Sequence, residues 1–194
     1  MRELILASTS KYRRELLERL RVPFRCEAPN VDEAALKASY GAIPAQTLAC
    51  RLAEAKADEV GLRFPKSVII GSDQVCVCEG QILSKPGTAK RAVEQLRMLA
   101  GKTHKLLTAI CVRHPTETIV DCDCTELKMR LLTSREINRY VAADQPLDCA
   151  GSYKLESLGI SLFESIRSDD HTAIVGLPLL HLAEILRQYG YRVP

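Results

Sequence analysis

Asp73 is the residue whose setting in the sequence points most directly to chemistry. It lies in VIIGSDQV, from Val68 to Val75, where the apolar residues are typical of a buried strand. A carboxylate in such a strand is costly unless a positive charge or a metal ion faces it. We therefore expect a cation beside Asp73, although the residue taken alone is more typical of an aspartate that caps a turn.

A lysine follows Asp73 within the same expected hairpin. Lys85 precedes Pro86, and the proline ring restricts the backbone that carries the ammonium group. Asp73 and Lys85 could then flank one cleft. The alternative is a solvated surface lysine.

Glu33 in VDE and Lys56 in AEAK are weaker candidates, because acidic loops and helix lysines are usually solvated. Their value lies in the combination with Asp73. Carboxylates can hold a divalent cation, and Lys or Arg can neutralise phosphate oxygens, which together is what phosphoryl-group chemistry requires.

The first turn of the chain adds a candidate anion site. LILASTSKYRRELL, Leu4 to Leu17, is typical of a strand, a polar turn and a helix. Such a turn offers backbone N–H groups and the positive end of a helix to an anion. Ser8, Ser10 and Arg13 suit phosphate, whereas Tyr12 does not.

The elements that must position these residues alternate along the chain. Apolar spacing and turn residues predict strands at 4–7, 22–29, 67–78, 81–83, 103–114, 118–132 and 160–168, and helices at 11–21, 45–60, 88–101, 135–143 and 177–190. Residues 30–44 are expected to be an irregular acidic segment, and 144–159 a loop. Thr133 and Glu136 have the spacing of a capping box. The mixture favours an α/β fold with a mixed sheet.

The composition is that of an ordinary globular protein. Hydrophobic residues make up 46% and charged residues 26% of 194 residues, so we expect a single domain over 1–194. No apolar run is long enough to span a bilayer, and the start lacks a signal peptide's apolar region, which predicts a cytoplasmic protein without a membrane partner. A net charge of +3 with interspersed signs does not indicate a nucleic-acid surface.

The chain has 8 cysteines, and without an export signal we expect them to be reduced thiols. Cys76 with Cys78, and Cys122 with Cys124, form two Cys-x-Cys pairs. A zinc site built from both pairs is an alternative, although the spacing differs from that of the usual zinc knuckle.

Taken together, these motifs resemble the Maf family in order and spacing: LILASTSKYRRELL, VDE, AEAK, IIGSDQV, LSKP, LDCAGSY and VGLPL. The resemblance implies a nucleoside triphosphate pyrophosphatase that uses Mg²⁺, Mn²⁺ or Co²⁺, and a homodimer. The implied fold is similar to that of the inosine triphosphate pyrophosphatases (Maf/Ham1): a mixed, partly antiparallel elongated sheet flanked by helices, in two lobes with a central cleft. Lys11 replaces the proline that many members have there.

The resemblance also implies roles for particular residues. Asp73 matches the family's proton acceptor, and Asp73 and Glu33 would hold the metal. The implied catalytic residues are Asp73, Lys85, Lys56, Arg13 and Glu33, and the implied substrate-binding residues are Ser8, Ser10, Tyr12, Gln74 and Glu156.

Three of these positions resemble the family branch associated with 7-methyl-GTP: an aromatic at Tyr12, Gln74 and Glu156. An aromatic face attracts a positively charged N7-methylated purine by about 0.5 to 2 kcal/mol. A carboxylate can accept both neighbouring N–H donors of guanine. The expected reaction yields 7-methyl-GMP and pyrophosphate.

Other interpretations stay open from the sequence alone. Tyr12 could simply cover the first helix, and Glu156 could pair with Lys154. The enzyme could hydrolyse dTTP and UTP, like another branch of the family. The protein could instead be a non-catalytic, nucleotide-binding regulator of cell division and septum formation.

Overall fold

The computed structural model describes residues 2–194, which divide into two compact units. Unit 1 contains the described residues up to Asp73 together with Thr108–Asp123 and Asp170–Pro194. Unit 2 contains Gln74–Leu107 and Cys124–Asp169. The two units agree with the two expected lobes, and the single domain over 1–194 stays a prediction.

The strands form one seven-stranded mixed sheet in the order β2-β1-β3-β5-β6-β7, with β4 paired to β3. The pairs β1–β2 and β1–β3 are parallel, whereas β3–β4 and β6–β7 are antiparallel, as expected for a mixed α/β fold. The strands are β1 (Leu4–Leu6), β2 (Arg25–Cys26), β3 (Val68–Cys78), β4 (Gln81–Leu83), β5 (Thr103–His114), β6 (Glu117–Met129) and β7 (Phe163–Arg167).

The helices begin close to the residues that the sequence indicates. They are α1 (Lys11–Glu18), α2 (Glu33–Tyr40), α3 (Ala45–Arg63), α4 (Ala89–Leu99), α5 (Ser134–Asp144), α6 (His171–Val175) and α7 (Leu179–Gln188), with two short 3₁₀ helices at Ala150–Ser152 and Leu158–Leu162. Several expectations were wrong. The strand expected over 22–29 is limited to Arg25–Cys26, α6 was not expected, and the loop expected over 144–159 contains the 3₁₀ helix Ala150–Ser152. Residues 30–44 contain α2, because the Asp32 side chain caps a helix there. Only the second half of 160–168 is a strand.

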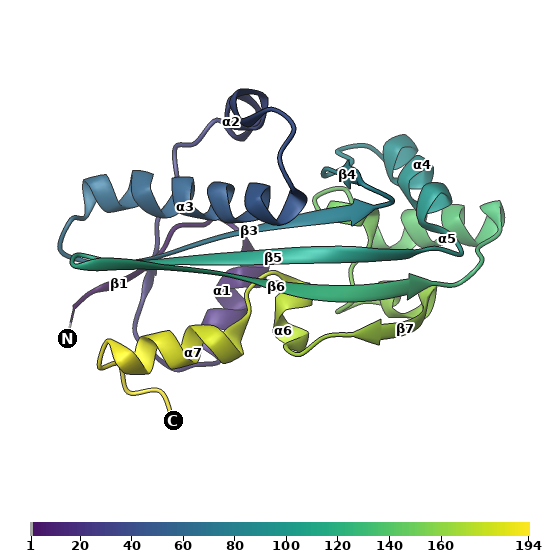
Figure 1. Ribbon diagram of the computed structural model, residues 1–194. Helices are drawn as coiled ribbons and strands as arrows, with labels where there is room; N and C mark the ends of the chain where they lie inside the picture. Colours follow the sequence, from purple (N-terminus) through teal and green to yellow (C-terminus); the bar gives the residue numbers. More distant parts are fainter. Residues whose placement is uncertain (1) are drawn as a thin grey trace. The chain divides into compact units, whose positions relative to one another are not determined.

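Unit 1 has helices on both faces of its part of the sheet (Figure 1). On one face, α1 and α7 bury leucines such as Leu16, Leu17 and Leu182 against strand residues that include Ile70. On the other face, α3 lies along the sheet with a stripe of small and branched residues. On this second face, α3 places Lys56 next to β3, the strand that carries Asp73.

Unit 2 pairs α4 with α5 and has a small aromatic cluster. His104 is buried, with Nε2 2.9 Å from the Tyr153 hydroxyl. Burial lowers the pKa of His104 to about 4, so the ring is neutral at physiological pH. The rings of Tyr153 and Phe163 meet edge to face, with centroids 4.9 Å apart.

The capping box expected at the start of α5 is confirmed. The Glu136 backbone N–H donates to Thr133 Oγ1, and the Thr133 backbone N–H donates to Glu136 Oε2 at 2.8 Å. Together with a hydrogen bond from Arg130, these contacts lower the pKa of Glu136 to about 2. This helix start therefore depends on an ionised carboxylate.

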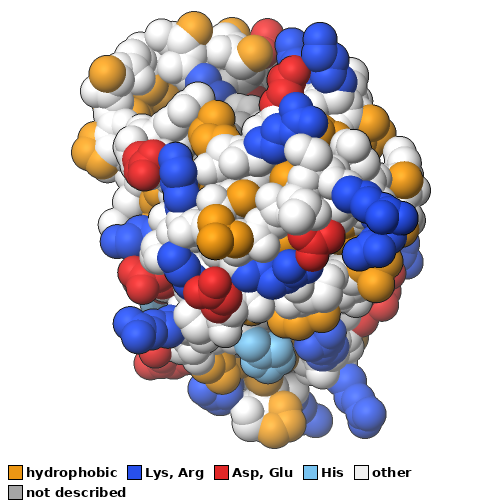
Figure 2. All heavy atoms as spheres, turned by 90° about the vertical axis from the view of Figure 1, so that its right-hand side faces the viewer, with side chains coloured by type: hydrophobic (Ala, Val, Ile, Leu, Met, Phe, Trp, Pro, Cys, Tyr) orange, Lys and Arg blue, Asp and Glu red, His pale blue; other side chains and the backbone are white. Residues whose placement is uncertain are grey.

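None of the helices within residues 2–194 is long and apolar enough to cross a membrane. On the face shown in Figure 2, basic and acidic side chains are interspersed and do not gather into a patch of one sign.

Candidate functional site

The turn after β1 has the structure expected of an anion site. Ser10 caps α1, since its Oγ accepts from the Arg13 backbone N–H at 3.4 Å. Ser8 is 6% exposed, and its Oγ accepts from the Ser10 backbone N–H at 3.1 Å. The first turn of α1 has no acidic residue. The helix start therefore keeps the positive character that favours an anion.

Tyr12 extends from the same turn and is half-buried. Lys11 Nζ lies 4.9 Å from the centroid of the Tyr12 ring. The ring is thus within cation–π distance of a positive charge in the chain itself. Lys11, the departure from the usual family sequence, contacts the residue expected to stack on the base.

Asp73 lies inside β3, as one of the two sequence interpretations predicted. Its carboxylate is 9% exposed, and Oδ1 is 2.6 Å from Lys56 Nζ. The cation expected beside Asp73 is therefore Lys56. The pair can form because Gly71 lets α3 approach β3 closely: a Cβ at Gly71 would come within 2.2 Å of the Ala53 carbonyl oxygen.

Glu33 completes a three-residue charge cluster with Lys56 and Asp73. Lys56 Nζ is 2.7 Å from Glu33 Oε1, while Glu33 Oε2 is 3.9 Å from Lys37 Nζ. Glu33 is the first residue of α2, which lies on the far side of α3 from the sheet (Figure 1). The side chain of Glu33 is 39% exposed, so the cluster is open on this side.

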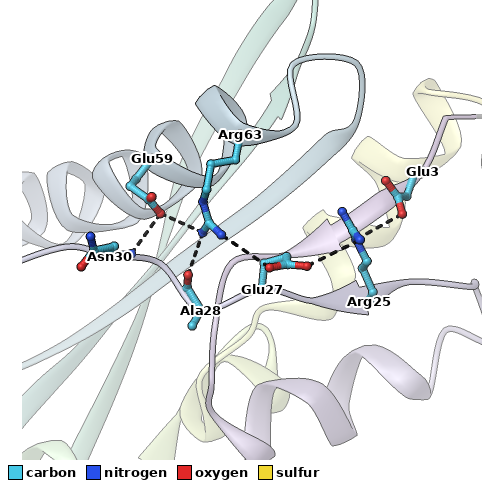
Figure 3. A network of polar contacts seen from close by, with 7 residues as sticks. All are labelled: Glu3, Arg25, Glu27, Ala28, Asn30, Glu59 and Arg63. Carbon is cyan, nitrogen blue, oxygen red and sulfur yellow. Dashed lines mark hydrogen bonds and ion pairs between the residues drawn. The ribbon is translucent and has the colours of Figure 1, made fainter.

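The segment that leads into α2 is tied to α3 by the polar network of Figure 3. Arg63 donates to the Ala28 carbonyl at 2.7 Å and to Glu59 Oε2 at 3.0 Å. The same oxygen of Glu59 accepts from the Asn30 backbone N–H at 3.0 Å. The bonds from Asn30 and Arg63 lower the pKa of Glu59. This network restrains the segment just before Glu33.

Arg13 shares a hydrogen-bond acceptor with Ser72, the residue before Asp73. Its Nε donates to the Gly176 carbonyl at 3.0 Å. Burial lowers the pKa of Arg13, and the negative charges of Asp73 and Glu33 oppose that change. A guanidinium stays charged in any case, so the anion-binding turn carries a fixed positive charge that interacts electrostatically with both carboxylates.

The residues present fit a divalent cation. Lys56 Nζ contacts one oxygen of Asp73 and one of Glu33, and the other oxygen of Glu33 lies 3.9 Å from Lys37 Nζ. Among residues 2–194, no group of three or more His, Cys, Asp or Glu side chains is arranged to hold a metal. Two carboxylates suit an ion such as Mg²⁺, which is often held by one or two carboxylates together with substrate phosphates.

Three predicted site residues belong to unit 2. Gln74 follows Asp73 in β3 and is half-buried. Lys85 is exposed beside the buried Pro86, in a segment fixed by a hydrogen bond from the Gly87 N–H to the Leu147 carbonyl at 3.0 Å. Glu156 lies exposed in a turn. Their roles stay predictions.

The cysteines give no support to the zinc alternative. Cys76 and Cys78 are both buried, as two residues on one side of a strand can be. Burial raises the pKa of Cys76 to about 12, which opposes the thiolate form that zinc requires. The described cysteines are all free thiols.

The sequence reasoning missed two residues that shape the site. Ser72 is fully buried, and its Oγ donates to the Gly176 carbonyl at 3.0 Å, the same atom that receives Arg13. Gly176 is 163 residues from Arg13 in the chain, so no local pattern predicts their contact. Gly176 has a positive φ of +124°, a conformation that favours glycine. The presence of a glycine at this position is the one signal in the sequence that could have indicated it.

These observations define a mixed α/β protein whose first turn and buried charge cluster suit an anionic, phosphate-bearing ligand. Residues 3–189 match the family described as Maf-like protein, and the chain belongs to this family.

Several relatives match over nearly the whole chain. A protein from Xanthomonas axonopodis pv. citri is 50% identical over 194 residues, which cover all of both chains. A protein from Albidiferax ferrireducens is 48% identical, with 99% of this chain and 96% of the relative covered. One from Pseudomonas aeruginosa is 43% identical over the full length of both. Each bears the name 7-methyl-GTP pyrophosphatase.

Proposed function

We propose that this protein hydrolyses 7-methyl-GTP to 7-methyl-GMP and pyrophosphate. The observation that carries the proposal is the cluster of Glu33, Lys56 and Asp73, in which one ammonium group contacts two carboxylates. Arg13 of the anion-binding turn is linked to it through the Gly176 carbonyl, which also accepts from Ser72, the residue before Asp73. The names of the full-length relatives support the choice of substrate.

In the proposed mechanism, Asp73 is the general base. Its Oδ1 is held by Lys56 at 2.6 Å, so Oδ2 is the oxygen that takes the proton from the attacking water. The new bond joins the water oxygen to the α-phosphorus, and the bond from that phosphorus to the α–β bridging oxygen breaks. Pyrophosphate leaves with the bonding electron pair.

The positive side chains stabilise the charge that develops during this step. Arg13 and the N–H groups around Ser8 and Ser10 would hold phosphate oxygens, and Lys56 would stabilise charge at the reacting phosphorus. Lys85 would neutralise charge on the leaving pyrophosphate. Glu33 and Asp73 would hold a divalent cation, whose chemistry when bound is to neutralise the triphosphate.

Recognition of the base is proposed for three residues. Tyr12 would stack on the cationic purine, because an aromatic ring face attracts a positive charge, and the Lys11 ammonium 4.9 Å from the ring centroid would have to move aside. Glu156 would accept the two N–H donors of guanine, with Gln74 as a further polar contact. We also propose a homodimer, as the resemblance implies, and a cytoplasmic location.

The test is a panel of 7-methyl-GTP, GTP, dTTP, UTP and CTP with Mg²⁺, Mn²⁺ or Co²⁺, in which pyrophosphate and monophosphate are both measured. We expect the highest kcat/KM for 7-methyl-GTP, and a loss of about 10²- to 10⁴-fold in kcat for Asp73→Asn. The matched control is Glu79→Gln, which removes an exposed carboxylate paired with Lys102 and should keep full activity.

The other outcomes would lead to different conclusions. Equal or better turnover of dTTP or UTP would make the protein a member of the pyrimidine branch. Tight nucleotide binding without release of pyrophosphate would favour the regulator. Full activity of Asp73→Asn would refute the assignment of the general base.

A further inference from the structure

One backbone oxygen in unit 1 connects the anion-binding turn to the strand of the general base. The Gly176 carbonyl accepts from Arg13 Nε at 3.0 Å and from Ser72 Oγ at 3.0 Å. Ser72 is the residue before Asp73. Because Nε is bound to the protein, the terminal amino groups of the Arg13 guanidinium are the ones directed to a ligand. The position of this oxygen therefore decides where the arginine points.

The backbone around Gly176 is held in an unusual conformation. Its φ is +124°, in the region that favours glycine, and its N–H donates to the carbonyls of Ala173 at 3.0 Å and Thr172 at 3.2 Å. A Cβ at this position would meet Arg13 Nε at 3.5 Å, which is ordinary contact. Glycine is thus required here for its backbone conformation.

A buried carboxylate fixes both ends of the loop that contains Gly176. Asp170 is 4% exposed, and its Oδ1 accepts from the backbone N–H of Thr172 at 2.8 Å and from the Thr172 hydroxyl. Its Oδ2 accepts from the Leu180 N–H at 2.8 Å. Thr172 Oγ1 in turn accepts from the Leu179 N–H at 2.8 Å.

These bonds tie the start of α6 to the start of α7, and the loop with Gly176 lies between the two tied points. A buried carboxylate and a buried hydroxyl that satisfy several backbone donors restrain the chain more strongly than exposed groups do. Loss of the Thr172 hydroxyl would leave the Leu179 N–H without this acceptor and would loosen one of the two ties.

We propose that Asp170 and Thr172 are positioning residues for Arg13. They fix the loop whose Gly176 carbonyl holds Nε, and so direct the terminal amino groups of the guanidinium toward the phosphate chain. Neither residue is proposed to touch the substrate. The inference rests on the proposed function, since it assigns Arg13 to the triphosphate.

The test is a double-mutant cycle that joins Thr172→Val to Arg13→Ala. With 7-methyl-GTP, Thr172→Val should lower kcat/KM by about tenfold, and Thr172→Ser, which keeps the hydroxyl, should stay within about twofold of the wild type. In the Arg13→Ala background, Thr172→Val should cost less than about twofold, because the group that it positions is already gone.

Ser67→Ala is the matched control. Ser67, the residue before β3, is 8% exposed, and its hydroxyl donates to Glu3 at 3.1 Å. This variant also loses a largely buried hydroxyl, and it should leave kcat/KM unchanged in both backgrounds. If Thr172→Val lowers kcat/KM by the same factor with and without Arg13, its role is merely structural and the proposal is wrong.

A binding measurement separates this proposal from the proposed function. Calorimetric titration of pyrophosphate with Mg²⁺ can be run through the same cycle whether or not the protein turns over a nucleotide. Weaker binding in Thr172→Val that disappears in the Arg13→Ala background supports the positioning role. A wild type that binds pyrophosphate but releases none from the nucleotide panel refutes only the proposed function.

Should Thr172→Val fail to fold, Asp170→Asn replaces it in the cycle. An asparagine keeps one acceptor oxygen for Thr172 but presents an amide where Leu180 needs an acceptor. The same dependence on Arg13 is expected, and additive effects would again overturn the proposal.

Discussion

Lys56 offers the sharpest test of the charge cluster, because one nitrogen holds two carboxylates. Lys56→Met removes the ammonium while a side chain of similar length still fills the space along α3. Asp73 and Glu33 are then left facing each other without the cation that lies 2.6 Å and 2.7 Å from them in the wild type.

The expected size of the effect follows from burial. Removing one partner of a buried ion pair costs about 3 to 5 kcal/mol. Asp73, at 9% side-chain exposure, falls in that class, whereas the pair with Glu33, at 39%, is screened by solvent and adds at most about 1 kcal/mol. We therefore expect Lys56→Met to lower the free energy of unfolding by about 3 kcal/mol.

The assay is urea unfolding of the wild type, of Lys56→Met and of the double variant Lys56→Met/Asp73→Asn. The double variant no longer buries an unpaired charge, so it should regain most of the lost stability. As a control, Lys102→Met removes the partner of the exposed Glu79, and should change stability by less than about 1 kcal/mol. Equal destabilisation of the single and double Lys56 variants would refute the buried-pair reasoning.

Three further predictions concern the base, a buried histidine and a helix cap. Tyr12→Ala should raise KM for 7-methyl-GTP by about 2- to 30-fold with little change in KM for GTP, whereas Tyr12→Phe should leave both values unchanged. Lys11→Ala should lower KM for 7-methyl-GTP, because it frees the face of the Tyr12 ring. Equal effects of Tyr12→Ala on both nucleotides would contradict stacking on a cationic base. The pKa of His104 is lowered to about 4, so the unfolded state binds more protons than the folded state between about pH 6.5 and pH 4. The free energy of unfolding should therefore fall by about 3 kcal/mol as the pH falls through that range. In urea unfolding measured at each pH, His104→Gln should remove this dependence. The pKa of Glu136 is lowered to about 2, so the ionised carboxylate stabilises the folded state above about pH 4.5, and this stabilisation is lost as the pH falls through about 2. Glu136→Gln should therefore have a lower thermal midpoint than the wild type at pH 7. A difference in thermal midpoint that did not shrink with falling pH would contradict the capping box.

Local signals were enough to predict much of the fold. The capping box at Thr133 is formed as its spacing indicates, because it depends on two residues three positions apart. Asp32 carries a similar signal for α2, but the acidic composition of residues 30–44 favours irregular structure. The short α6 was missed as well.

The sequence predicts the types of residue that form the candidate site better than it predicts which of them are in contact. The sequence indicates that a cation lies beside Asp73, but it does not identify that cation as Lys56. Lys56 reaches Asp73 because Gly71 has no side chain and lets α3 approach the strand. The contact of Arg13 with Gly176 spans 163 residues and depends on the packing of α1 against the loop before α7. Long-range contacts of this kind are set by tertiary packing, which local spacing does not encode.

The most direct test of the central claim is a turnover of 7-methyl-GTP in water labelled with ¹⁸O, with mass analysis of both products. Attack on the α-phosphorus, assisted by Asp73, predicts one ¹⁸O atom in 7-methyl-GMP and none in pyrophosphate. Label in pyrophosphate or in free phosphate, or no turnover at all by the wild type, would contradict the account.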